Sequence, residues 1–175
     1  IENALNTLNK KNIFVDVLIN NAAIDPKVRN QSGLSETSRL ENFSVDDWNL
    51  QLDVGLKGAF LCTKFFGHDM SLRGGGVILN ISSDLSVISP DQSLYKRADL
   101  DDYMQPVKPV TYSVIKTGLV GLTRYISTYW ANQGGRCNAL SPGGVFQDQD
   151  KDFVVKLENK IPLGRMANID EYNST

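Results

Sequence analysis

The stretch Tyr112-Ser113-Val114-Ile115-Lys116 opens a helical pattern that continues to about position 133. Residues four apart lie on the same face of a helix, so the Tyr112 hydroxyl and the Lys116 ammonium can share one site. A phenol ordinarily titrates near ~10, and a neighbouring cation lowers that pKa by favouring the phenolate. The pair is therefore a candidate acid or base for proton transfer, although the same spacing also occurs in ordinary surface pairs.

Three further segments have the composition of buried strands. Residues 16–23 end in Asn-Asn-Ala-Ala, residues 76–83 end in two serines, and residues 136–144 run into a Pro-Gly turn. The apolar run from Ile13 to Asn20 is interrupted only by Asp16, as expected for a strand that is covered on both faces. Strands that alternate with helical patterns predict a parallel sheet with helices on both of its faces.

Taken in their order along the chain, these three segments and the helix of Tyr112 and Lys116 resemble those of the short-chain dehydrogenase/reductase family. Its members carry an Asn-Asn-Ala-Gly strand end, a serine after a central strand, a Tyr-x-x-x-Lys helix and a Pro-Gly turn. The resemblance covers essentially the whole chain, with Ala23 where the family usually has Gly. It implies an α/β fold, a Rossmann-like doubly wound parallel sheet flanked by helices, in one domain over residues 1–175. It also implies an NAD(P)-dependent oxidoreductase.

The resemblance implies a role for each catalytic residue. Tyr112 would donate or remove the hydroxyl proton while a hydride passes to or from the nicotinamide. Lys116 would lower the pKa of Tyr112 and hold the nicotinamide ribose. Ser83 would hydrogen-bond the substrate oxygen, because the family uses the second serine of such a pair. Ser82 is then expected to satisfy backbone groups at the strand end.

The resemblance also implies NAD or NADP as cofactor. Tyr112 and Lys116 would contact it together with the residues that approach the adenosine half, Asn20 and Ala22, and those of the turn beside the nicotinamide amide, Pro142, Gly143 and Val145. On its own, the Asn-Asn pair indicates a turn at a strand end. No metal site is expected, because His68 is the only histidine and has no ligand partners at suitable spacing.

The two ends of the chain predict a fragment. It begins at Ile1, within an amphipathic helical pattern, and stops at Thr175 without a closing strand. We therefore expect the N-terminal strands and the C-terminal end of the family domain to be missing. The Gly-rich turn that holds the cofactor pyrophosphate would be missing with these strands. Glycines 74–76 precede a strand and glycines 134–135 follow a helix, so both are predicted to be connections. Such a fragment is expected to bind dinucleotide poorly and to expose apolar sheet surface.

Two features depart from the family pattern. The separation between Ser83 and Tyr112 is about twice that common in the family, so residues 84–111 are predicted to be an inserted loop that forms a lid or part of the substrate pocket over the active site. The alternative is a surface excursion. Gly55 stands where many members have an Asn that holds a proton-relaying water. This substitution also fits a non-catalytic member that acts as a nucleotide-sensing or dimerising module.

Composition and charge limit the classes of partner. The net charge is −2 and the charged share is 22%, which favours neither nucleic acid nor an anionic membrane as partner. No apolar run is long enough for a membrane span, and Cys62 and Cys137 are expected to be reduced core thiols, which indicates a cytoplasmic protein. The family resemblance implies a homodimer or homotetramer, paired through the helix that starts at Tyr112 and the helix before it.

The predicted function is therefore the interconversion of a carbonyl and a hydroxyl on a polar small molecule. The polar insertion and a polar, partly helical segment over residues 147–160 indicate a hydrophilic substrate. A sugar or sugar nucleotide of surface-glycan synthesis is the narrower prediction. The choice between NAD and NADP depends on a residue that follows the Gly-rich turn.

Overall fold

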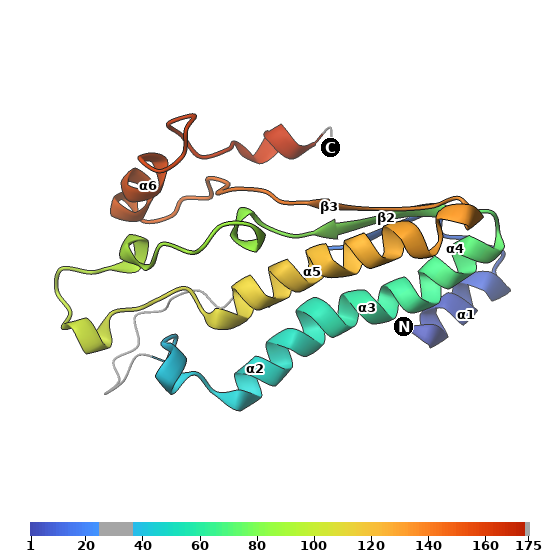
Figure 1. Ribbon diagram of the computed structural model, residues 1–175, viewed down its shortest axis with the longest axis horizontal. Coiled ribbons are helices and arrows are strands. Elements are labelled where there is room, and N and C mark those ends of the chain that lie inside the picture. Colours follow the sequence, from blue (N-terminus) through green and yellow to red (C-terminus); the bar gives the residue numbers. More distant parts are fainter. Residues whose placement is uncertain (25–36, 174–175) are drawn as a thin grey trace.

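Three parallel strands form the sheet of this computed structural model, which describes residues 1–24 and 37–173. The strands β1 (Val17–Asn20), β2 (Gly76–Ile81) and β3 (Gly135–Leu140) lie side by side in that order (Figure 1). β1 and β2 lie within segments predicted to be strands, and β3 begins one residue before its predicted segment, at Gly135. The predicted parallel sheet is confirmed.

Helices occupy most of the remaining chain. They are α1 (Glu2–Lys10), α2 (Val45–Leu52), α3 (Gly58–Cys62), α4 (His68–Leu72), α5 (Val110–Tyr129) and α6 (Lys151–Glu158). Two π-helical turns, η2 (Asp53–Lys57) and η3 (Thr63–Gly67), join α2, α3 and α4 into one continuous helix. The 3-10 turns are η1 (Leu40–Asn42), η4 (Asp84–Ser86), η5 (Gln92–Tyr95), η6 (Asp102–Met104), η7 (Ala131–Gln133) and η8 (Ile169–Tyr172). Residues 25–36, which are mostly polar, lie outside the described part.

The hydrophobic core lies between the sheet and the two long helices. Ile78 of β2 is in register with Cys137 of β3, and both are buried. They pack with Met70 of α4 and Ile126 of α5. Figure 1 shows α3 and α5 on the same side of the sheet, where they contact the strands. The core therefore lies between one face of the sheet and a single layer of helices.

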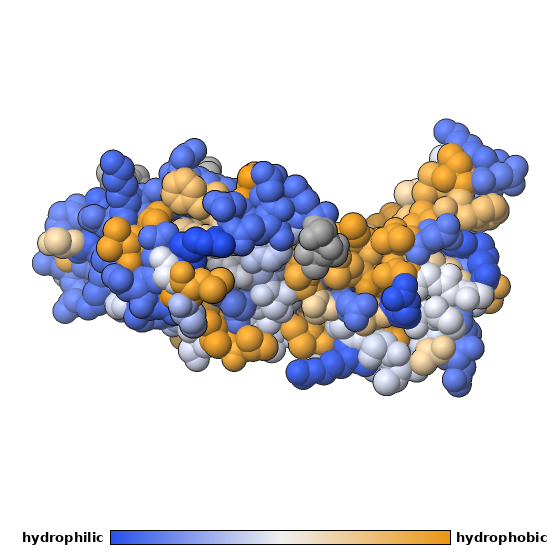
Figure 2. Space-filling model, turned by 90° about the horizontal axis from the view of Figure 1, so that it is seen from above, coloured by the Kyte–Doolittle hydropathy of each residue, from blue (hydrophilic) through white to orange (hydrophobic). Residues whose placement is uncertain are grey.

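The other face of β1 is open to solvent. Val17 and Ile19 are each 57% exposed, and Figure 2 shows hydrophobic surface on the half of the molecule that holds the strands. The prediction that the run from Ile13 to Asn20 is covered on both faces is therefore wrong for the described residues. The predicted exposure of apolar sheet surface is confirmed.

The continuous helix over residues 45–72 buries a row of residues at every fourth position. The row consists of Gln51, Gly55, Ala59, Thr63 and Gly67. Four residues of an α-helix turn about 40° beyond one full turn, so a regular α-helix would carry such a row away from the core. The π-helical turns η2 and η3 have more residues per turn and correct this drift.

A buried hydrogen-bond network connects the sheet to both long helices. Asn80 in β2 is fully buried, and its Nδ2 donates to Thr123 Oγ1 of α5 at 2.8 Å. Its Oδ1 accepts from Asn20 Nδ2 of β1 at 2.8 Å, and that Nδ2 also donates to Thr63 Oγ1 at 3.2 Å. Because a buried amide without partners is costly, the network sets the positions of β1, β2, α5 and η3 relative to one another.

Candidate active site

The carboxyl end of β2 carries Ser83, which caps the turn η4. Ser83 is 4% exposed. Its Oγ donates to Asp84 Oδ1 at 2.8 Å and accepts from Leu85 N at 3.2 Å. Because η4 packs against α5, the Ser83 hydroxyl lies beside the helix that carries the predicted Tyr-Lys pair.

Tyr112 and Lys116 lie one turn apart near the start of α5. Lys116 is 8% exposed, and its Nζ donates to the carbonyl oxygen of Ile81, the last residue of β2, at 2.8 Å. The same Nζ is 5.6 Å from the centroid of the Tyr112 ring. The structure therefore brings the ammonium and the phenol together, and it attaches the ammonium to the strand end that precedes Ser83.

The two serines at the end of β2 have different partners. Ser82 is 3% exposed, and its Oγ donates to the carbonyl oxygen of Lys116 at 2.8 Å. Ser82 thus satisfies the α5 backbone, in agreement with its predicted role. The partners of the Ser83 hydroxyl are instead a side chain and an amide of its own turn. Rotation about one bond is enough to turn that hydroxyl toward a ligand.

The end of β1 contains the two residues predicted to approach the adenosine half of the cofactor. Asn20 is 8% exposed, and its amide nitrogen is used within the core network. Ala22 is exposed just beyond the strand. The amide nitrogen of Asn20 therefore supports the sheet, and contact of Asn20 and Ala22 with a cofactor stays a prediction.

The turn after β3 lies against η4. The carbonyl oxygen of Pro142 accepts from Asp84 N at 3.0 Å. Gly143 is exposed, and a Cβ built on it would lie 3.7 Å from Asp84 Oδ2. Val145 lies farther along the turn, where it pairs with Ala167. Pro142 and Gly143 thus share the carboxyl edge of the sheet with the end of β2, as predicted for parallel strands.

Gly55 faces α5 across a close helix contact. It is buried in η2, and a Cβ built on it would lie 2.8 Å from Ile115 Cγ2. Ile115 directly precedes Lys116 on α5. An Asn at position 55 would overlap this side chain, so the missing relay residue is accompanied by tighter packing of the two helices.

The insertion over residues 84–111 packs on α6 and the segment that follows it. The rings of Tyr95 and Phe153 have centroids 5.6 Å apart, and Asp91 forms an ion pair of 2.5 Å with Lys160. The hydrogen bond from Lys160 holds the pKa of the Asp91 carboxyl well below its usual range. The insertion and the polar segment over residues 147–160 therefore contact each other.

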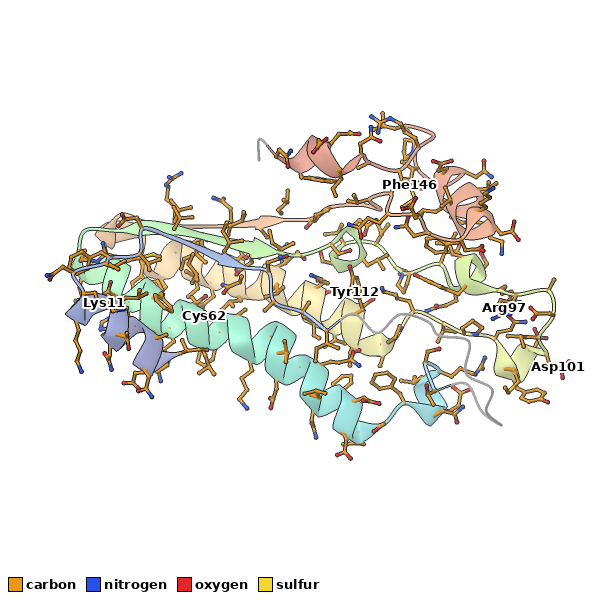
Figure 3. All side chains as sticks on the ribbon, turned by 180° about the vertical axis from the view of Figure 1, so that it is seen from behind. Lys11, Cys62, Arg97, Asp101, Tyr112 and Phe146 are labelled. Atoms are coloured by element: carbon orange, nitrogen blue, oxygen red, sulfur yellow. The ribbon has the colours of Figure 1, made fainter. Side chains whose placement is uncertain are left out.

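The tip of the insertion lies far from the candidate site. Figure 3 shows Arg97 and Asp101 at the end of the molecule, away from Tyr112. The tip is closed by Gln105, whose Nε2 donates to Arg97 O at 2.9 Å and whose Oε1 accepts from Arg97 N at 2.8 Å. A lid over the site remains a prediction that involves the ends of the insertion and not its tip.

Two residues of the site were missed by the sequence reasoning. Lys108 Nζ lies 3.7 Å from the centroid of the Tyr112 ring. The sequence feature that could have identified Lys108 is its position four residues before Tyr112, as Lys116 is four residues after it. Asp84 accepts the hydrogen bond of Ser83. Its signal is adjacency to the predicted catalytic serine.

Comparison with protein families gives a match to each half of the chain. Residues 1–97 match the family described as short chain dehydrogenase. The chain belongs to the short-chain dehydrogenase family. Residues 102–175 match a second family, described as Enoyl-(Acyl carrier protein) reductase. The predicted family and its Rossmann-like fold are therefore confirmed.

Individual relatives agree with this membership. The D-threitol dehydrogenase of Mycolicibacterium smegmatis is 28% identical over 162 residues, which are 90% of this chain and 52% of that protein. A short-chain dehydrogenase from Leptospira borgpetersenii with bound NAD+ superposes with a TM-score of 0.76 at 30% identity, over 95% of this chain and 58% of that one.

A gluconate 5-dehydrogenase from Burkholderia cenocepacia, in complex with NADP and tartrate, also superposes with a TM-score of 0.76, at 26% identity. The match covers 97% of this chain and 59% of that one. This short-chain dehydrogenase sequence spans about half the length of the curated relatives it matches.

Other features of the described residues concern membranes, metals and thiols. No described helix has the length and hydropathy needed to cross a bilayer. Within residues 1–24 and 37–173, no group of three His, Cys, Asp or Glu side chains is placed to hold a metal ion. Cys62 and Cys137 are free thiols, and burial raises the pKa of both.

Proposed function

We propose that this short-chain dehydrogenase is an NAD(P)-dependent enzyme that interconverts a carbonyl and a hydroxyl on a polar small molecule. The observation that carries the proposal is the position of Lys116 Nζ, 2.8 Å from the Ile81 carbonyl oxygen and 5.6 Å from the Tyr112 ring centroid. Ligands of open α/β sheets bind at the carboxyl ends of the strands, where this group lies. The NAD+ and NADP bound to the Leptospira and Burkholderia proteins support the choice of cofactor.

The residues at this edge fit the nicotinamide half of a dinucleotide. Lys116 offers a charged donor for ribose hydroxyls, and exposed Gly143 has no side chain to hinder a close approach. Ala22, small and exposed at the end of the neighbouring strand, leaves room for the adenosine half. The bound cofactor supplies the hydride or accepts it. The protein's own part is to place the substrate and to move one proton.

Three side chains divide the proton chemistry. In oxidation, the Tyr112 phenolate removes the proton of the substrate hydroxyl, and in reduction the phenol returns it to the carbonyl oxygen. Lys116 favours the phenolate because its ammonium lies close to the ring. Ser83 turns its O–H from Asp84 to the substrate oxygen and stabilises the charge that develops there.

We assign the substrate to the class of sugars or sugar nucleotides, of the kind used in surface-glycan synthesis. The threitol and gluconate named for two of the relatives are polyhydroxylated, which supports a hydrophilic substrate. Figure 2 shows mainly hydrophilic surface over the half of the molecule opposite the strands. We also place the protein in the cytoplasm, which is consistent with two free thiols.

The test is oxidation of NADH and NADPH by the full-length protein across a panel of sugar, sugar-nucleotide and simple carbonyls. Turnover with polyhydroxylated carbonyls and little with apolar ones is the expected result. Cofactor binding without turnover on any member of the panel would instead support the non-catalytic alternative that Gly55 suggests. Absence of both binding and turnover would contradict both functions.

Substituting each of the paired serines should separate their roles. Ser83→Ala is expected to lower kcat by about 10²-fold, because one donor to the developing oxyanion is lost. Ser82→Ala should instead lower the free energy of unfolding by about 0.5–1.5 kcal/mol, because it removes the buried side-chain hydrogen bond to the Lys116 carbonyl oxygen. Steady-state kinetics and urea denaturation of both variants measure this. Equal effects on kcat would contradict the assignment of Ser83.

We further propose a homodimer or homotetramer that forms through the outer face of α3, α4 and α5. A groove of about 640 Å³ lies there, with Phe60, Tyr125 and Tyr129 among its lining residues. These three side chains are 49%, 61% and 58% exposed, and aromatic residues are enriched in protein interfaces. Sedimentation equilibrium of the full-length protein tests the proposal, and a monomer at micromolar concentration would contradict it.

A further inference from the structure

A second ammonium approaches the candidate catalytic tyrosine more closely than the one expected from its helix. Lys108 Nζ is 3.7 Å from the Tyr112 ring centroid, whereas Lys116 Nζ is 5.6 Å away. Lys108 and Tyr112 are both half-buried. A cation over the face of an aromatic ring is attracted by the negative potential of that face, and the attraction grows as the pair is removed from water.

The backbone around Lys108 is held at several points. Lys108 N donates to Gln92 Oε1 at 2.9 Å, which links the returning end of the insertion to its outgoing part. Val107 N donates to Ser38 Oγ at 3.0 Å. The next residue, Pro109, is the N-cap of α5 and has a restricted φ. The ammonium therefore approaches the ring from an ordered backbone, so that only side-chain freedom is lost when it binds.

We propose that Lys108 is a second cation of the active site, a positioning residue that orients the Tyr112 ring and favours its phenolate form. The inference rests on the proposed function, because it assigns proton transfer to Tyr112. A phenolate carries more negative charge than a phenol, so a cation a few ångströms from the ring stabilises it preferentially. The insertion then contributes to the chemistry through its last residues and not only to the shape of a substrate pocket.

The charged residues on the elements around α5 can be compared with this pair. Those on the elements packed against α5 are Asp84 in η4, Arg136 in β3, Asp46 and Asp47 in α2, and Asp53 and Lys57 in η2. Asp53 and Lys57 form an ion pair with each other at 3.1 Å. Asp84 is engaged by Ser83 Oγ and Leu85 N. Lys108 and Lys116 are the two cations recorded over the Tyr112 ring among the described residues.

The experiment is a titration of Tyr112 that does not require turnover. Tyrosine ionisation is followed by ultraviolet absorbance in the full-length protein, and each variant is compared with its own Tyr112→Phe counterpart so that all other tyrosines cancel. Lys108→Met is expected to move the Tyr112 titration to higher pH and to lower its ionised fraction at a fixed pH by roughly three- to tenfold. Lys108→Arg, which keeps the charge, should titrate as the parent protein does.

The matched control is Lys96→Met, which removes the same charge from the same insertion. Lys96 Nζ lies 3.7 Å from Asp102, in an exposed pair of the tip region. This variant is expected to leave the Tyr112 titration unchanged. A Lys108→Met curve that coincides with the control would overturn the proposal, and so would a Lys108→Arg curve that shifts as far as Lys108→Met. Because absorbance reports ionisation directly, a protein that fails to turn over any carbonyl still gives a readable result.

If the titration shifts as expected, the pH dependence of oxidation gives a second readout. The phenolate is the base in that direction, so the rate rises with pH as Tyr112 ionises. Lys108→Met should displace this rise to higher pH. At pH values below the rise, kcat should fall by the same three- to tenfold, with KM nearly unchanged. A fall in kcat that is equal at every pH would indicate a structural defect and would overturn the proposed action on Tyr112.

Discussion

Tyr112→Phe is expected to lower kcat for carbonyl reduction by about 10²–10⁴-fold, the contribution typical of a positioned general acid. The substitution removes only the hydroxyl, and the ring that both Lys108 and Lys116 approach is kept. Folding and cofactor binding should therefore change little. The expected signature is a large loss of kcat with nearly constant KM, because the lost proton transfer acts in the transition state and not in substrate binding.

The control for this experiment is Tyr103→Phe. Tyr103 is 66% exposed in η6, within the insertion. The Tyr103→Phe variant loses the same hydroxyl group outside the site, so its kcat should equal that of the parent protein. Steady-state kinetics with NADH and NADPH measure both variants, and cofactor titration by fluorescence checks that binding survives. Equal activity of Tyr112→Phe and Tyr103→Phe would remove Tyr112 from the mechanism.

Gly75→Ala is expected to lower the free energy of unfolding by about 3 kcal/mol or more. Gly75 connects α4 to β2 with a φ of +116°, and a Cβ built on it would overlap the carbonyl group of Gly134. Gly134 belongs to the connection between α5 and β3, so two turns meet here backbone against backbone. Relief of the overlap requires one turn to move away from the other, which disturbs the start of both strands.

Gly74→Ala provides a closely matched control. Gly74 also has a positive φ, +97°, but a Cβ built on it would meet nothing within 4 Å. The conformational penalty of about 1–2 kcal/mol for a side chain at positive φ is then common to both variants. The difference between their unfolding free energies, measured by urea denaturation, isolates the contact with Gly134. If Gly74→Ala is as destabilising as Gly75→Ala, the close approach of the two turns is not the cause.

The strands and the Tyr-Lys pair were predictable because local rules decide them. Apolar stretches that end in turn residues indicated the strands, and all three lie within one residue of the predicted segments. A spacing of four on a helix puts Tyr112 and Lys116 on one face whatever surrounds them. The helix cap at Ser44, whose Oγ accepts from Asp46 N and Asp47 N, is another local feature.

Features that depend on the path of distant segments were not predictable. The position of Lys108 over Tyr112 requires the insertion to return beside η5 and residue 38, which no local pattern specifies. The π-helical turns around Gly55 arise because the helix must keep one row of residues against α5 and the sheet over its whole length. The exposed face of β1 likewise depends on where the helices pack. The apolar sequence of this strand does not show whether helices cover one face or both.

By itself, the sequence determined the family, the parallel order of strand and helix, and the phenol with its ammonium one turn away. The family follows from four motifs in their order along the chain, and the other two features follow from side-chain periodicity, which acts between residues close in sequence. The tertiary structure alone decided that Ser83 gives its hydrogen bond to Asp84, that the Asn20 amide nitrogen joins the core network, and that a second lysine lies over the Tyr112 ring. Such contacts join residues brought together by packing, so their geometry exists only once the core has formed.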